Sequence, residues 1–273
     1  MGTENLLQSL GHVSRSATDL WVDGHAKDLA TLEEFTHLES LSLYRLAKTN
    51  IPVLSNLILP KLTSFGLRLV PISDFRPFHQ IKSLKDLTIW QCPKLRSLES
   101  IEDLPNITSL HVSDLGSPLS LETIERLPKL KKLYISGSVN AVQTVTSLQP
   151  IGNIGKRLST LELHGTKAVD KKLQPLTQLP EPESFTLTPW LFPLEEIALL
   201  AAVYPKWQKS LMTIHVDHYK KCGTCGSELR QTFAYRSRAK CPSCDRSSFE
   251  KFENDFLALV QEKKNSKQLD IFR

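Results

Sequence analysis

The chain has 273 residues, of which 40% are hydrophobic and 23% are charged, and its formal net charge is +5. This ordinary globular composition allows one elongated domain or two compact ones, and the mild charge permits an anionic partner without requiring one. No apolar run approaches the roughly 20 residues that a membrane span needs, and residues 1–20 lack a secretory pattern. We therefore expect a cytoplasmic protein with no membrane partner.

A short pattern recurs along the chain, in the order apolar, two variable, apolar, one variable, apolar. The clear copies begin at Leu38, Leu62, Leu84, Ile107, Leu130 and Leu158, and weaker copies begin at Ala17, Pro182 and Leu211. Successive copies start 21 to 29 residues apart. Copies at such regular spacing indicate a repeat protein.

Each copy predicts a short strand followed by a compact return. Side chains alternate over the last four residues of a copy, which is typical of a half-buried strand. Apolar residues then recur at every third position, as in Leu95, Leu98, Ile101 and Leu104, and this spacing favours a 3₁₀ or short helical segment. One coil cannot bury its apolar side alone, so the coils are expected to stack into a continuous core.

Residues 17–217 resemble the leucine-rich repeat family, in particular its short cytosolic repeats of about 22 residues. The resemblance implies an α/β solenoid over residues 1–217, with a parallel sheet on its concave face and short helical or 3₁₀ returns. The family places Asn after each strand, where its side chain ties adjacent turns together. Here those places hold His25, Leu46, Val70, Cys92, Leu115, Ser138, Thr166 and Trp190. Only the polar members and Cys92 can replace that hydrogen bond, so irregular turns are expected.

Two insertions interrupt the repeats. Residues 136–156 lengthen one repeat, and their GNIGK stretch is interpreted as a turn because it lacks the spacing of a phosphate loop. Residues 193–205, PLEEIALLAAVYP, begin and end with proline and carry two early glutamates. These signals predict a helix that packs on the convex side.

Four cysteines near the C-terminus, Cys222, Cys225, Cys241 and Cys244, have the spacing C-x2-C-x15-C-x2-C. Two C-x-x-C turns can direct four thiolates at one ion in a tetrahedron, which predicts one structural zinc per chain; iron could load into the same four sulfurs. The segment resembles a zinc ribbon. We assign residues 218–273 to this module and a terminal helix.

The module follows the last repeat too closely for a flexible linker, so we expect it to cover the apolar end of the solenoid. The segment SSFEKFENDFLALVQEKK predicts a helix capped by Ser247 or Ser248. Its apolar stripe is Phe249, Phe252, Phe256 and Val260. This stripe is interpreted as core, with a partner-binding helix as the alternative.

Basic residues surround the cysteines, and those considered for nucleic-acid contact are Lys220, Lys221, Arg236, Arg238 and Lys240. Phe233 and Tyr235 lie among them, as in a base-stacking platform. The alternative is that the bases offset the negative charge of a zinc ion bound to four thiolates. Both interpretations stay open at the level of sequence.

Residues between the apolar strand positions are predicted to face the concave side. The candidates for binding a protein partner are Tyr44, Arg68, Trp90, His111, Tyr134, Glu162 and His164. Trp21 is expected only to cover the first coil. Glu162 and His164 would share a strand side at about 7 Å, whereas His111 and His215 would lie roughly 10 Å from Glu162, too far for the hydrogen bonds of an acid–base set. We expect a non-catalytic protein-interaction scaffold, as an adaptor or immunity protein would be, with a nucleic-acid-associated protein as the alternative.

Overall fold

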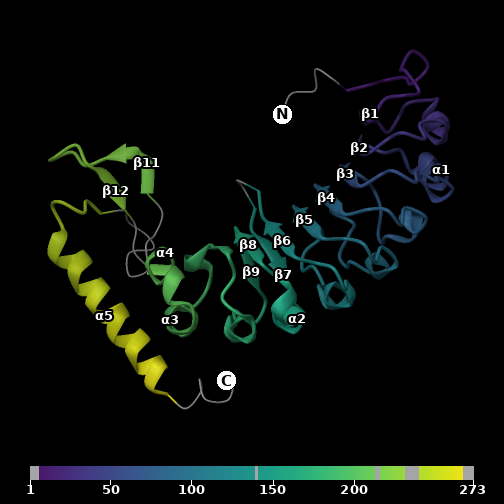
Figure 1. The fold of residues 1–273 in the computed structure, drawn as a ribbon. Helices are drawn as coiled ribbons and strands as arrows, with labels where there is room; N and C mark the ends of the chain where they lie inside the picture. The colour runs from purple at the N-terminus through teal and green to yellow at the C-terminus, as the bar shows by residue number, and fades with distance from the viewer. Residues whose placement is uncertain (1–5, 139–140, 213–215, 231–239, 267–273) are drawn as a thin grey trace.

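A computed structural model describes residues 6–138, 141–212, 216–230 and 240–266 (Figure 1). Its main feature is an 8-stranded parallel sheet in the order β1-β2-β3-β4-β5-β6-β8-β10. The strands are β1 Asp19–Asp23, β2 Ser40–Tyr44, β3 Ser64–Arg68, β4 Asp86–Trp90, β5 Ser109–Ser113, β6 Lys132–Ser136, β8 Thr160–His164 and β10 Ser184–Leu187. Figure 1 shows them stacked along the inner side of a curve, with the returns outside. The predicted solenoid with a parallel concave sheet is confirmed.

The returns are short, as the three-residue spacing predicts. They comprise η1 Leu29–Glu34, η2 Lys48–Asn50, α1 Ile51–Ser55, η3 Arg76–Phe78, η4 Ile101–Asp103, η5 Glu122–Arg126, α2 Gln149–Ile154, η6 Gly155–Arg157, η7 Gln174–Gln178 and η8 Pro189–Leu191. Leu95, Leu98, Ile101 and Leu104 are all buried between a strand and its return. The returns therefore complete the outer wall of the core.

The core is one continuous cluster that runs through the coils. Register places one inward-facing row on the eight strands: Leu20, Leu41, Phe65, Leu87, Leu110, Leu133, Leu161 and Phe185. Each member is at most 5% exposed. Phe65 also meets Phe78 of the following return edge to face, with ring centroids 5.2 Å apart. Every coil therefore buries its apolar side against its neighbours.

At the ends of the strands, backbone hydrogen bonds join neighbouring coils in place of most of the Asn side-chain bonds that the resemblance implies. Arg45, Leu69 and Gln91 each follow a strand with a φ of 55° or 56°. Their amides donate to carbonyls of the next coil at 2.9–3.0 Å. This left-handed conformation turns each amide out of its own strand and towards its neighbour. The coils are consequently joined without the Asn that the family uses.

At the Asn positions, two of the candidate side chains contact a neighbouring coil. Thr166 donates to the carbonyl of Ile135 at 2.8 Å. Cys92 is buried with the backbone of Leu69 and Val70 directed at its sulfur, and burial raises its thiol pKa to about 11. His25 and Ser138 are exposed instead.

The 136–156 insertion is more regular than predicted. It contributes β7 Gln143–Val145, which pairs in parallel with β9 Thr166–Ala168, and then α2. The GNIGK stretch is helical, so its interpretation as a turn was wrong. A Cβ on Gly152 would collide with the carbonyl oxygen of Pro175, which shows that this glycine permits close packing of α2 on η7.

The strand that the last copy of the pattern, beginning at Leu211, predicts falls largely on residues 213–215, which lie outside the described residues. Leu211 and Met212 end the short helix α4 Gln208–Met212. The strand β11 Val216–Lys221 pairs antiparallel with β12 Glu228–Arg230 in a sheet of its own. Before α4, the predicted helix is confirmed as α3 Leu194–Val203, followed by the 3₁₀ turn η9 Pro205–Trp207.

Helix α5 Arg246–Asn265 covers the C-terminal end of the repeats by packing against α3 (Figure 1). Phe252, Phe256 and Val260 are buried, and the last two belong to the main core cluster. Three of the four residues of the predicted stripe are therefore buried as expected, while Phe249 is half-buried. The helix begins before the two serines, and Asp245 precedes it with no side-chain cap bond, so the predicted Ser cap was wrong.

Removing the ring of Phe256 should loosen the C-terminal end. Phe256→Ala is expected to lower the free energy of unfolding by about 3–5 kcal/mol, because the residue is fully buried between α5 and the repeats. Urea unfolding measures the loss, and amide exchange should rise first in α3. The matched control is Leu257→Ala, whose side chain is 38% exposed and whose cost should stay below about 1 kcal/mol. Equal losses in both variants would contradict the packing described.

Candidate functional site

The concave face is organised by the register of the sheet into parallel rows of side chains. One row contains Trp21, Ser42, Gly66, Thr88, His111, Tyr134, Glu162 and Thr186. The next contains Asp23, Tyr44, Arg68, Trp90, Ser113, Ser136 and His164. The structure therefore brings all seven sequence-predicted partner-binding residues onto one face, spread over β2 to β8.

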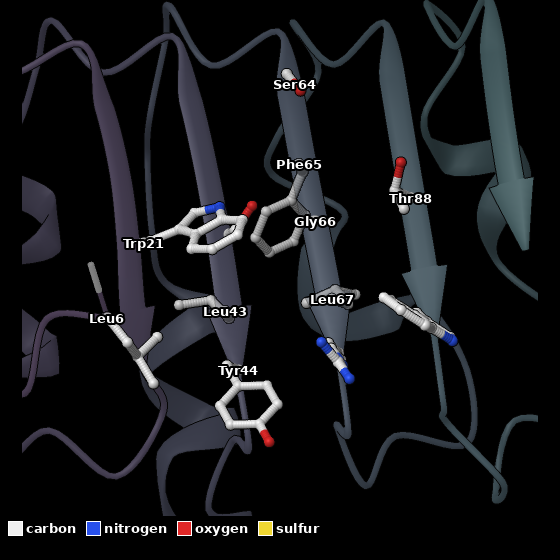
Figure 2. A pocket seen from close by; sticks show the side chains of 12 residues that line it. Leu6, Trp21, Leu43, Tyr44, Ser64, Phe65, Gly66, Leu67 and Thr88 are labelled. Carbon is white, nitrogen blue, oxygen red and sulfur yellow. The ribbon is translucent and has the colours of Figure 1, made fainter. Parts of the chain in front are cut away.

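A groove of about 280 Å³ lies across β1 to β4 at the N-terminal end of this face. Its described lining residues are Leu6, Trp21, Ser42, Leu43, Tyr44, Ser64, Phe65, Gly66, Leu67, Arg68, Thr88 and Trp90. Figure 2 shows the indole of Trp21 extending from β1 across β2 towards Gly66 on β3. Trp21 is thus a wall of the groove, and the prediction that it only covers the first coil was wrong.

The floor of the groove is made by small residues between large ones. Ser42, Gly66 and Thr88 occupy neighbouring positions of one row, after Trp21 and before His111. A Cβ on Gly66 would lie 2.7 Å from Oγ of Ser42, so even Ala would reduce the space there. The sequence did not reveal the groove, because a hollow needs small side chains at neighbouring positions on three adjacent strands.

Arg68 is held between two aromatic rings at the edge of the groove. Its guanidinium carbon lies 4.0 Å from the ring centroid of Trp90 and 5.4 Å from that of Tyr44. Its Nε donates to Oε1 of Gln91 at 3.0 Å. These cation–π contacts and the hydrogen bond fix the guanidinium plane and stabilise the exposed rings. Trp90 nevertheless stays 38% exposed.

Asp23 anchors the end of the same row. Its carboxylate is 2% exposed and accepts from Nη2 of Arg45 at 2.6 Å and from the amide of His25 at 3.0 Å. Arg45 in turn lies over Tyr44, 4.9 Å from the ring centroid. Burial by itself would raise the pKa of Asp23, but the bonds from His25 and Arg45 outweigh it and hold that pKa below its usual value.

The C-terminal half of the face is more polar. The rings of His111 and Tyr134 lie 5.6 Å apart and tilted. Glu162 pairs in register with Tyr134, which places it two strands from His111. Among the described residues, neither His111 nor His164 forms a hydrogen bond with Glu162. Burial lowers the pKa of His111, and the charge of Glu162 opposes that shift.

The four cysteines come together as their spacing predicts. All four Sγ atoms lie within 4.8 Å of one another. Cys222 and Cys244 are 3.8 Å apart between sulfurs, and Cys225 and Cys241 are 3.3 Å apart. Metal–sulfur bonds of about 2.3 Å in a tetrahedron give sulfur–sulfur edges of about 3.8 Å. The donor set therefore fits a single tetrahedral metal ion.

The local backbone holds these sulfurs in position through hydrogen bonds and tight turns. The amides of Thr224 and Cys244 point at the sulfurs of Cys222 and Cys241, each at 3.4 Å. Gly226, with a φ of 72°, allows its amide to return to the carbonyl of Cys222 at 2.9 Å. The hydroxyl of Ser227 lies 3.3 Å from Sγ of Cys225, and hydrogen bonding there lowers the pKa of that thiol, whereas bonds from the neighbouring sulfurs raise the pKa of Cys244. Thiolates are the form that binds metal.

The basic residues considered for nucleic-acid contact are only partly placed. Lys221 is exposed and Lys240 is half-buried at a bridge with Arg230. Arg236 and Arg238 lie outside the described residues, as does the side chain of Lys220. Nucleic-acid contact by these residues stays a prediction.

Comparisons with known proteins found solved structures that resemble parts of the chain. No family model and no curated protein matches the chain. Internalin C2 of Listeria monocytogenes is 19% identical, over 64% of this chain and 72% of its own, with a TM-score of 0.47. A leucine-rich repeat protein of Leptospira interrogans is 18% identical, over 61% and 42%, with a TM-score of 0.40.

A plant peptide hormone receptor, solved in complex with RGF2, is also similar. It is 18% identical over 68% of this chain and 39% of its own, with a TM-score of 0.31. Because these superpositions are only partial, the assignment rests on the parallel sheet and the short returns. The chain is a leucine-rich repeat solenoid with a four-cysteine cluster and a helix at its C-terminal end. Among the described helices, none is long and apolar enough to span a bilayer.

Asp23 should make the stability of the first coils depend on pH. Because its folded-state pKa lies below the unfolded value of about 3.9, ionised Asp23 stabilises the fold above that pH. The stabilisation is lost as the pH falls through the folded-state pKa. The destabilisation caused by Asp23→Asn, measured by urea unfolding, should therefore be larger at about pH 6.5 than at about pH 2.5. The matched control is Asp86→Asn, an exposed carboxylate on the same sheet. A pH-independent cost for Asp23→Asn would contradict the account.

Proposed function

We propose that this protein is a non-catalytic scaffold that binds a protein partner on its concave face, in an adaptor or immunity-type role. The observation that supports it is the row from Tyr44 through Arg68 to Trp90, in which aromatic rings remain accessible on a continuously hydrogen-bonded sheet. Aromatic and arginine side chains dominate the affinity of protein interfaces. His111, Tyr134, Glu162 and His164 extend the proposed surface along the face.

Rigidity is the physical advantage of such a surface. Strand register fixes the spacing of the rows, and the contacts of Arg68 hold its neighbouring rings in place. Less side-chain entropy is then lost when a partner binds, so more of the contact energy appears as affinity. The open face, with no described nucleophile–base hydrogen bond, supports binding rather than catalysis.

We propose further that the cysteines hold one structural zinc, in a module of residues 218–273 that follows a solenoid of residues 1–217. Four sulfur donors leave no open ligand position, which is typical of structural sites. The zinc would secure the short β11–β12 hairpin, because binding energy at a structural metal site is also folding energy. Thiols remain available as ligands in a reducing compartment, so we place the protein in the cytoplasm.

Partner capture tests the proposed face. When tagged protein is used to capture partners from a lysate of its own organism, Trp90→Ala together with Tyr134→Ala should reduce recovery of the principal partner at least about tenfold. Both residues project from the sheet, so the melting temperature should change little. The control is Ile58→Ala, which removes a 68% exposed side chain in the loop before β3. Undiminished recovery by the double variant would reject the concave face as the binding surface.

Metal analysis tests the cysteine site. Protein purified from zinc-supplemented medium should contain one zinc per chain by mass spectrometry, and Cys222→Ser should lose most of it because a tetrahedral site needs every ligand. Amide exchange should then rise in β11 and β12 before it rises in the repeats. Cys92→Ser is the matched control, because Cys92 is buried in the repeats and should leave the zinc content unchanged. A chain that folds fully without any metal would contradict the proposed structural role.

A further inference from the structure

We propose that the groove across β1 to β4 binds an extended segment of a partner protein that carries a bulky apolar side chain and, two residues away, a side-chain carboxylate. The apolar side chain occupies the floor at Gly66, and the carboxylate pairs with Arg68. This inference rests on the proposed scaffold function and adds the chemistry of the partner to it.

The groove has the size and the lining for one or two side chains. Its volume of about 280 Å³ falls just below the range of about 300–1,000 Å³ that is usual for pockets holding whole small molecules. Trp21 forms one wall and Tyr44 stands at the edge, both labelled in Figure 2, while bare backbone at Gly66 forms the floor. An apolar side chain placed there would bury ring surface and displace water.

Charge complementarity specifies the second feature of the partner. Arg68 is the only charged residue among the described residues that line the groove. Its Nε is bonded to Gln91 and its plane is fixed by two rings, while Nη1 and Nη2 have no acceptor among the described residues. An arginine held in this way is prepared to pair with a carboxylate in a planar, hydrogen-bonded geometry.

The spacing follows from strand geometry. Gly66 and Arg68 are two residues apart on β3 and face the same side, so their Cα atoms are about 6.6 Å apart. An extended segment presents its alternate side chains with the same period. A segment aligned with β3 can therefore place an apolar residue over Gly66 and an acidic residue over Arg68. The order of the two residues depends on the direction of the segment.

Selection from a random peptide library tests the inference. Phage-displayed 12-residue peptides are selected on the wild-type chain and counter-selected on Gly66→Val. Valine fills the floor and is favourable in a strand, and the close contact of its Cβ with Ser42 is relieved when that hydroxyl rotates, so this variant should fold. We expect enriched peptides to contain a bulky apolar residue and an Asp or Glu two positions away. Enrichment without that pairing, or no enrichment, overturns the inference.

A double-mutant cycle isolates the charge pair. An enriched peptide, acetylated and amidated so that only side chains carry carboxylates, is compared with its Glu→Gln version on wild-type protein and on Arg68→Met. The Glu→Gln change should weaken binding to wild type about five- to tenfold and leave binding to Arg68→Met nearly unchanged. Equal weakening on both proteins overturns the role of Arg68.

The remaining controls distinguish a partner segment from a second copy of the chain as the occupant of the groove. They also distinguish failure of the groove chemistry from failure of the scaffold function. Thr186→Val places the same valine on the same row of β10, outside the groove, and should bind the peptide as wild type does. Self-association of the chain that Gly66→Val abolishes would identify a second copy as the occupant and overturn the inference. If the native partner is lost on mutating Trp90 and Tyr134 but no such peptide is enriched, the scaffold function stands and the groove chemistry fails.

Discussion

The structure depends on one constraint, which is that no coil of this chain can bury its apolar side without a neighbour. The inward row from Leu20 to Phe185 is almost completely shielded from water because each member packs between equivalent residues of the adjacent strands. Burying such side chains contributes on the order of 1.5–3 kcal/mol each, and this contribution needs the stack to be in register. The same register also fixes the positions of the side chains on the concave face of the sheet.

The same constraint applies at the two ends of the stack, where the outermost coil has a neighbour on one side only and other residues must cover its apolar side. At the N-terminus, Leu7 adds a parallel bridge beside Val22, and Leu10 is buried with its amide bonded to Asp28 at 2.7 Å. At the C-terminus, α3 and α5 provide the cover, and Phe256 joins the main core. The terminal helix therefore does the covering that the sequence assigned to the cysteine module as a whole. The cysteine loops lie beside it and remain largely exposed.

Register also explains why the concave face has an apolar groove at its N-terminal end and polar residues at its C-terminal end. Large side chains around small ones produce the apolar groove over β1 to β4, whereas more polar residues occupy the same rows on β5 to β10. Contacts along one row connect Asp23, Arg45, Tyr44, Arg68 and Trp90 across four strands. Such a connected row holds exposed rings in place, a feature that the proposed binding function requires.

The sequence by itself determined the repeat, the concave rows and the cysteine cluster, because each depends on spacing along the chain. Leucine positions define strands, and two C-x-x-C turns bring four sulfurs together wherever the module lies. Only the tertiary structure decided what happens at the boundaries and between coils. After β10, the next described strand, β11, pairs antiparallel with β12 in a separate sheet and does not extend the parallel one. The groove at Gly66 and the clamping of Arg68 depend on side chains about 22 residues apart in sequence, which become neighbours only when the coils stack.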